Sequence, residues 1–267
     1  MILKKIIIDY NNNNKKMMSG PIVSNDSYVS LQPLIVHTPI LMNKYTDLVH
    51  KKKFISRVYT ILWFQILFTS VYIGLCNQLV LLQKFMLSPL GINLTYLSSI
   101  LILFTSCILV CLYDSIRRFP YNYLYLVCFT ILITYPLGLI GIFVDTQTLL
   151  LGGLTTSSVF TGLTIYAYQT KVNYTMYGNV LIIGLFGLIM LGIFIPFVNI
   201  PLLNSLYSVG GVTLFSFYIV YDTQLITGGS ERNIVYTTDD YVIASINLYL
   251  DFINLFVFLL DIIGGRN

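Results

Sequence analysis

The chain has 267 residues, of which 56% are hydrophobic and only 10% are charged, and its mean hydropathy is +0.79. Soluble domains carry roughly 25% charged residues, so this composition excludes a water-soluble globule and predicts an all-α polytopic membrane protein. The net charge of +4 does not indicate a nucleic-acid partner, because most basic residues precede Tyr59 and the others separate apolar segments. That distribution is typical of orientation signals in a bilayer.

Residues 1–50 form a polar region that differs in composition from the rest of the chain. The stretch "DYNNNNKKMMSG" is rich in Asn and Lys, and Pro21, Pro33 and Pro39 follow it. A segment of this kind has too little apolar surface to offset the entropy lost on folding. We therefore predict a flexible cytosolic tail over residues 1–50 and a single transmembrane domain over residues 51–267.

Seven apolar runs follow the tail, and each approaches the roughly 20 residues that a helix needs to cross a bilayer. Pro136 and Pro196 are expected to kink the third and fifth runs, and the Gly210-Gly211 pair is expected to allow close helix packing. The seventh run has Asp251 near its middle, so a re-entrant segment is its alternative. The predicted spans are 58–76, 94–113, 121–144, 148–168, 179–200, 203–227 and 241–263.

The positions of Lys and Arg predict how these spans are oriented. With the tail in the cytosol, 13 of the 15 basic residues fall on the cytosolic side, and only Lys84 and Arg266 fall opposite. Cytosolic loops of membrane proteins carry such an excess of positive charge. The N-terminus is therefore predicted to be cytosolic, and the C-terminus to lie on the other side if the seventh run spans the membrane.

Two aspartates interrupt the apolar runs. Asp222 lies near the end of the sixth run in "YDTQLITGG", and Asp251 lies near the middle of the seventh in "LYLDFINLF". An ionised aspartate at the bilayer centre costs about 2.5–3.5 kcal/mol, so such residues face the bundle interior and find a partner. Asn247 and Asn254 lie four residues before and three residues after Asp251, which places all three on one helix face. This supporting polar stripe is expected to face protein.

The sixth and seventh runs are consecutive, so Asp222 and Asp251 can meet if their depths agree. Asp222 lies six residues before Gly228, or about 9 Å along a helix, and Asp251 lies ten residues after Tyr241, or about 15 Å. The mismatch is about one helical turn, which tilt can absorb. Two carboxyl groups in contact would share one proton. Such a pair can bind a cation, relay a proton, assist hydrolysis or simply lock two helices together, and these alternatives remain open.

The C-terminal third, "FYIVYDTQLITGG" followed by "DDYVIASINLYLDFINLFVFLLDIIGG", resembles the Bax inhibitor-1 family, which includes the transmembrane Bax inhibitor motif proteins and viral Golgi anti-apoptotic members. The segment "FISRVYTILWFQILFT" is similar to the first span of that family. The segment "FPYNYLYLVCFT" is similar to the start of its third span. The resemblance covers roughly residues 50–267 and leaves the tail unmatched.

The resemblance implies a seven-helix protein of the endoplasmic reticulum or Golgi membrane that leaks calcium in a pH-sensitive way and suppresses apoptosis. It places the family's pH sensor, ion gate and transient Ca²⁺ contact on Asp222 and Asp251, with no resident cofactor. It also implies a basic latch at the cytosolic end of the second span, for which Arg117 and Arg118 are the candidates and Ser115 the alternative. A glutamate that many members carry early in the third span is missing from "CFTILITYPLG".

We therefore predict a pH-gated calcium leak whose partners are the lipid bilayer, Ca²⁺ and protons. The alternative is a non-conducting regulator that binds other calcium channels or cell-death proteins. An enzyme is not expected: an intramembrane aspartyl protease needs a Gly-any-Gly sequence where Tyr249 and Leu250 precede Asp251. A rhomboid-type serine protease is disfavoured because no His lies in a predicted span.

Overall fold

The computed structural model describes residues 32–198, 200–228, 236–237 and 239–265. The chain divides into two compact units, Met1–Val49 and His50–Asn267. Every long element among the described residues is an α-helix. The all-α architecture predicted from composition is therefore confirmed.

The structure describes only part of the predicted tail, residues 1–50. Residues 1–31 lie outside the described residues, whereas helix α2 (Gln32–Gln78) begins 18 residues before His50. The flexible tail over residues 1–50 stays a prediction, although helix α2 covers residues 32–50. Pro33 is compatible with this helix because it stands in the first turn, where its missing N–H is not needed, and a largely apolar stretch follows it.

Seven helices are long and apolar enough to cross a membrane, and each coincides with one of the seven predicted runs. The first is the Val49–Gln78 part of α2. The remaining candidates are α4 (Pro89–Cys111), α6 (Tyr121–Phe143), α7 (Thr146–Gln169), α8 (Gly178–Phe194), α9 (Pro201–Thr227) and α10 (Tyr241–Gly264). Four short elements join them: α3 (Val80–Met86), α5 (Tyr113–Ile116), and the 3-10 turns η2 (Tyr174–Tyr177) and η3 (Ile195–Phe197).

The two helix prolines behave differently. Pro136 lies inside α6, which continues through it. Pro196 does not kink its helix as predicted, because α8 ends at Phe194 and Pro196 lies in the following 3-10 turn. Proline lacks the N–H that continues the helix and its ring collides with the preceding turn, so a tighter turn there ends α8.

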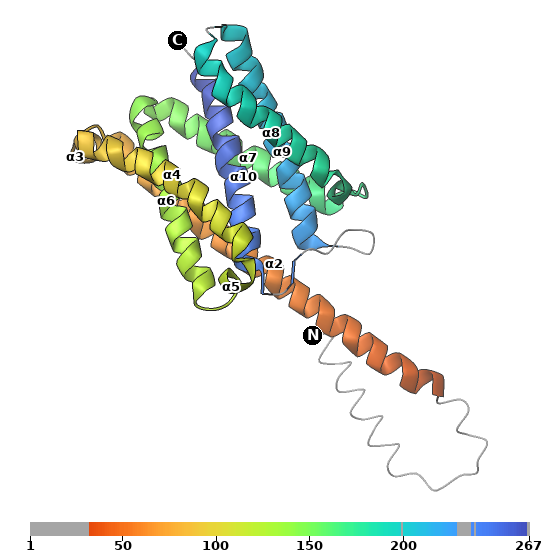
Figure 1. Ribbon diagram of the computed structural model, residues 1–267. Helices are drawn as coiled ribbons and strands as arrows, with labels where there is room; N and C mark the ends of the chain where they lie inside the picture. The colour runs from red at the N-terminus through yellow and green to blue at the C-terminus, as the bar shows by residue number, and fades with distance from the viewer. Residues whose placement is uncertain (1–31, 199, 229–235, 238, 266–267) are drawn as a thin grey trace, which may run out of the picture. The chain divides into compact units, whose positions relative to one another are not determined.

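Helix α10 forms the core of the second unit. Figure 1 shows it in dark blue running through the middle of that unit, where it packs against α6, α7 and α9. Within its membrane-length window 72% of the residues are buried, compared with 6% in α4. A Cβ added at Gly211 would lie 2.5 Å from the ring of Phe258, so α9 and α10 approach closely there. The predicted packing role of Gly211 is confirmed.

Candidate carboxylate site in the helix bundle

The structure brings Asp222 and Asp251 together at the interface between α9 and α10. Their side chains are only 7% and 5% exposed, and the two carboxyl groups are in hydrogen-bonding contact. Asp222 lies five residues before the end of α9, and Asp251 lies ten residues after the start of α10. Helix α10 is largely apolar outside its polar stripe and most of its residues are buried, so the bundle surrounds it and withdraws Asp251 from the surface.

The immediate surroundings of this pair are aromatic. Tyr218, one turn before Asp222 on α9, is close enough to interact electrostatically with both carboxyl groups, and Tyr221 interacts with Asp222. Apart from the contact with Asp222, the buried Oδ2 atom of Asp251 has no hydrogen-bond partner among the described residues. A buried acceptor that stays unsatisfied is costly, so this oxygen is a place where a proton or a polar ligand would be stabilised.

A patch of buried hydroxyl groups gathers around Thr223, the residue after Asp222. Thr223 is fully buried. The hydroxyl of Tyr59 on α2 approaches both Thr223 and Thr164, the latter on α7. Polar groups from α2, α7 and α9 therefore converge at Thr223.

The supporting polar stripe does not join this site as a unit. The Nδ2 atom of Asn247 donates to the hydroxyl of Tyr236, 2.8 Å away in the loop before α10. The Nδ2 atom of Asn254 donates to the carbonyl of Leu250 in its own helix, also at 2.8 Å. Because both amides are engaged elsewhere, Asp251 is the member of the stripe that forms the carboxylate site.

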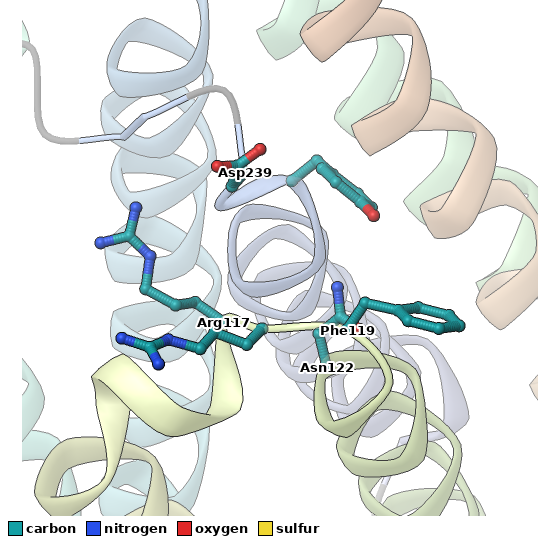
Figure 2. Close-up of a pocket in the computed structure, with 6 residues that line it drawn as sticks. Arg117, Phe119, Asn122 and Asp239 are labelled. Carbon is teal, nitrogen blue, oxygen red and sulfur yellow. The ribbon is translucent and has the colours of Figure 1, made fainter.

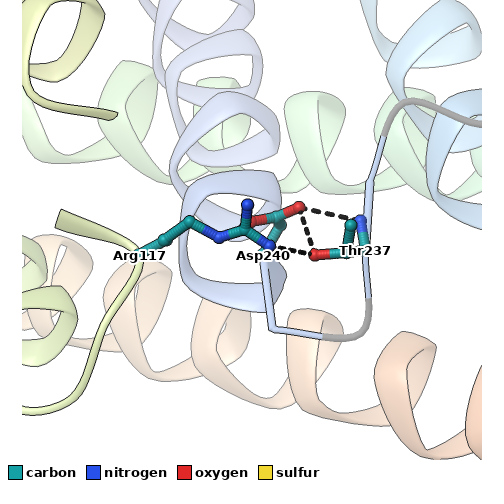
Figure 3. A network of polar contacts seen from close by, with 3 residues as sticks. All are labelled: Arg117, Thr237 and Asp240. Carbon is teal, nitrogen blue, oxygen red and sulfur yellow. Dashed lines mark hydrogen bonds and ion pairs between the residues drawn. The ribbon is translucent and has the colours of Figure 1, made fainter. Parts of the chain in front are cut away.

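The candidate latch residue Arg117 reaches a different carboxylate. Its Nε lies 3.3 Å from Oδ1 of Asp240, and its Nη2 donates to Thr237 Oγ1 at 2.6 Å. The backbone N–H and hydroxyl of Thr237 both donate to the other oxygen of Asp240 at 2.7 Å, as Figure 3 shows. We call this group, Arg117, Thr237 and Asp240, the α10 clamp.

The α10 clamp lies far from the carboxyl pair. Asp240 precedes Asp251 by 11 residues, which is about 16 Å along a helix. Asp240 is 1% exposed, so the clamp fixes the start of α10 at a buried position. Arg118 lines a neighbouring cavity, and Ser115 is exposed. A basic latch on Asp222 and Asp251 stays a prediction.

A ladder of buried polar side chains was missed in the sequence. Thr69 on α2 bonds to Thr134 on α6 at 3.0 Å and to the hydroxyl of Tyr249 on α10 at 2.7 Å. One turn away, Gln65 Nε2 donates to Thr130 Oγ1 at 2.9 Å. The signal was present, because α2 and α6 each carry two of these polar residues at i and i+4, which places them on one face.

Gln224 lies in the "YDTQ" motif, and no role for it was predicted from the sequence. It is fully buried, its Nε2 donates to the carbonyl of Val172 at 2.9 Å, and its Oε1 accepts from the N–H of Tyr174 at 2.7 Å. These bonds satisfy two backbone groups of the loop before η2. They also hold the end of α9, two residues after Asp222, against that loop.

The site does not resemble a resident metal centre. No group of three or more His, Cys, Asp or Glu side chains that could hold a metal occurs among the described residues. Ca²⁺ takes roughly six to eight oxygen ligands, more than two carboxylates supply. The transient Ca²⁺ contact at Asp222 and Asp251 stays a prediction.

Comparison with known proteins yields one family and several relatives. The sequence model of the family described as "Inhibitor of apoptosis-promoting Bax1" matches residues 51–267. Protein lifeguard 3 of Homo sapiens is 30% identical over 218 residues, covering 80% of this chain and 69% of the relative. Protein lifeguard 3 of Mus musculus is 27% identical, covering 81% and 70%. Bax inhibitor 1 of Schizosaccharomyces pombe is 29% identical, covering 79% and 76%.

Proposed function

Because this chain belongs to the Bax inhibitor-1 family, we propose that it is a pH-sensitive calcium leak of an intracellular membrane that suppresses apoptosis. In this proposal it resides in the endoplasmic reticulum or Golgi membrane with its N-terminus in the cytosol. Its activity is the passage of an ion, with no enzymatic step. The observation that carries the proposal is the contact between the buried carboxyl groups of Asp222 and Asp251.

The proposed gate is the protonation state of this pair. Two carboxyl groups in contact away from water repel each other when both are charged, so the resting pair holds one shared proton. The shared proton ties α9 to α10. Loss of that proton leaves two negative groups that separate and offer hard oxygen ligands to a passing Ca²⁺ ion. Local electrostatics then shift a bundle between a closed and an open arrangement.

The surroundings of Asp222 and Asp251 favour a gating role for the pair; the alternative is a pair that only holds two helices together. Apart from each other, the two carboxyl groups have no hydrogen-bond partner among the described residues. A purely structural lock is expected to satisfy its remaining buried oxygens as well. The pair therefore favours a site that exchanges protons or water.

The test is calcium flux into liposomes that contain only the purified full-length protein, measured between pH 5 and pH 8. The unmodified protein is expected to change its flux across this range. Asp222→Asn and Asp251→Asn each replace a carboxyl with an amide of the same shape, so their flux should become nearly independent of pH. Asp145→Asn is the matched control, because Asp145 is an exposed residue at the start of α7.

The outcomes separate the candidate functions. A pH dependence that survives in both Asp222→Asn and Asp251→Asn contradicts the proposed gate. If the unmodified protein carries no calcium at any pH, the leak is excluded and the non-conducting regulator becomes the better account. Correct folding of each variant is checked by its elution as a single species in detergent.

A further inference from the structure

A polar cavity of about 420 Å³ opens where the loop between α5 and α6 meets the start of α10. It does not contain the carboxyl pair. Figure 2 shows Asn122 between Arg117 and Phe119 on one side of the cavity and Asp239 on the opposite side. Its lining residues are Arg117, Arg118, Phe119, Asn122, Asp239 and Tyr241.

Asn122 supplies a hydrogen-bond donor to this cavity. Its side chain is only 2% exposed, and its Oδ1 accepts from the N–H of Tyr123 at 2.9 Å. That bond fixes the amide orientation and leaves Nδ2 without an acceptor among the described residues. An amide N–H₂ that is accessible from a polar cavity and has no protein acceptor favours an acceptor as its ligand.

The charges around the cavity are separated. The charge of Arg117 is matched by Asp240 in the α10 clamp, whereas Arg118 has no ion-pair partner among the described residues. Asp239 faces Asn122 across the cavity. One side therefore offers a guanidinium and an amide donor, which suit a phosphate, and the other offers a carboxylate, which suits an ammonium.

Aromatic side chains indicate the depth of the cavity in the membrane. Phe119 is 79% exposed and Tyr121 is 61% exposed, and both lie at the rim where α6 begins. The ring of Tyr241 lies 5.3 Å from the guanidinium carbon of Arg57. Exposed aromatic rings beside Arg residues at helix ends are typical of the headgroup level of a bilayer. The ligand that this depth favours is a lipid headgroup.

We propose that this cavity binds the headgroup of a phospholipid that carries a primary ammonium, with its phosphate on Arg118 and Asn122 and its ammonium on Asp239. The bound lipid lies beside the α10 clamp and supports the start of α10. Basic pockets between transmembrane helices are a general means of holding lipid phosphates. The proposal does not depend on calcium conduction.

The test uses native mass spectrometry of the full-length protein in detergent, titrated with short-chain phosphatidylethanolamine or phosphatidylcholine. Both lipids carry the same phosphate, but the choline ammonium has no N–H to donate to Asp239. A hydrogen bond to a charged group changes affinity by about tenfold or more. We therefore expect phosphatidylethanolamine to bind about tenfold more tightly than phosphatidylcholine.

Three substitutions test which residues contact the phosphate of the headgroup and which contact its ammonium. Arg118→Gln and Asn122→Asp should each weaken both lipids by about tenfold, because one removes the cation and the other replaces a donor with an acceptor. Asp239→Asn should weaken phosphatidylethanolamine more than phosphatidylcholine and so reduce the preference between the two lipids, because both lose the attraction to the carboxylate but only the primary ammonium loses a hydrogen bond to it. Lys171→Gln is the control, since it removes one exposed positive charge outside the cavity.

Two results would overturn the proposal. The first is equal binding of phosphatidylethanolamine by the unmodified protein, Arg118→Gln and Asp239→Asn, the last two being changes at exposed positions that should not impair folding. The second is binding of free phosphoethanolamine or inorganic phosphate as tight as that of the lipid, which would make the cavity a site for a soluble anion.

Discussion

Helices α10 and α4 have the same mean hydropathy but occupy opposite environments. In their membrane-length windows 72% of α10 is buried and 6% of α4 is buried. Apolar content alone therefore does not indicate which helix lies at the centre of a membrane bundle. The two helices differ in where their polar side chains find hydrogen-bond partners.

The polar residues of α4 bond within their own helix. Thr105 and Ser106 donate to carbonyls of the preceding turn, which leaves the helix face compatible with lipid. In α10 the hydroxyl of Tyr249 bonds to Thr69 on α2, and Asp251 contacts Asp222 on α9. Polar groups that need partners from other helices require a central position, since lipid offers none.

The largest expected effect comes from shortening a leucine in each helix. Leu255 in α10 is fully buried, so Leu255→Ala should lower the free energy of unfolding by about 2–5 kcal/mol through lost contacts and a cavity. Leu103 in α4 is 69% exposed, and Leu103→Ala should change it by less than about 0.5 kcal/mol. Equilibrium unfolding in mixed detergent micelles measures the free energy of unfolding of both variants. Equal losses would contradict the contrast between the helices.

A glycine substitution tests how closely α9 approaches α10. In Gly211→Ala the new methyl would lie 2.5 Å from the ring of Phe258, so we expect a loss of about 1–3 kcal/mol. A Cβ added at Gly162 in α7 meets no described atom within 4 Å. Gly162→Ala should be neutral or stabilising by up to about 1 kcal/mol, because alanine favours helix. The same unfolding assay measures both variants. Equal changes in the free energy of unfolding for Gly211→Ala and Gly162→Ala would contradict the close approach of α9 to α10.

Removing one hydroxyl from each helix gives a smaller effect. Tyr249→Phe deletes the group that bonds to Thr69 and approaches Thr134, and it should cost about 1 kcal/mol. Tyr96 in α4 is 67% exposed, and Tyr96→Phe should cost nothing measurable. A double-mutant cycle of Tyr249→Phe with Thr69→Val should give a loss smaller than the sum of the single losses. Strict additivity would argue against a shared hydrogen bond.

The smallest effect is expected at the start of α7, outside the core. The backbone N–H of Thr148 donates to Asp145 Oδ2 at 2.9 Å and holds the pKa of Asp145 below its ordinary value of 3.8. A depressed pKa adds stability that is complete at neutral pH and is lost as the pH falls below the ordinary value. Thermal unfolding should show a small advantage over Asp145→Ala at pH 7 that vanishes near pH 2. An advantage that grows in acid would contradict this assignment.

The sequence allowed the seven helices to be located because each apolar run has the length of a bilayer and polar breaks separate the runs. It also indicated the two aspartates, because carboxylates inside apolar runs are rare and costly. The contact between Asp222 and Asp251 required only that consecutive helices be antiparallel neighbours, and the depth estimate was within about one turn.

Features that depend on contacts between distant segments were not accessible in the same way. The pairing of Arg117 with Asp240 depends on a loop geometry that charge counting does not provide. The ladder of Thr69, Thr134 and Tyr249 joins three helices whose neighbours are set by packing. The helical start of α2 at Gln32 was not predicted, because the proline and polar residues nearby are typical of a flexible segment.

The two hydrogen bonds of Gln224 have a mechanical consequence for the carboxyl pair. These bonds connect the last turns of α9 to Val172 and Tyr174, in the segment that joins α7 to α8. The position of Asp222 is therefore held by a third part of the bundle. Tyr249, two residues before Asp251, is bonded in the same way through its hydroxyl to Thr69 and Thr134 on two other helices. Each acid therefore has an anchored neighbour two residues away, and loss of either anchor would free that side of the pair to shift away from the other.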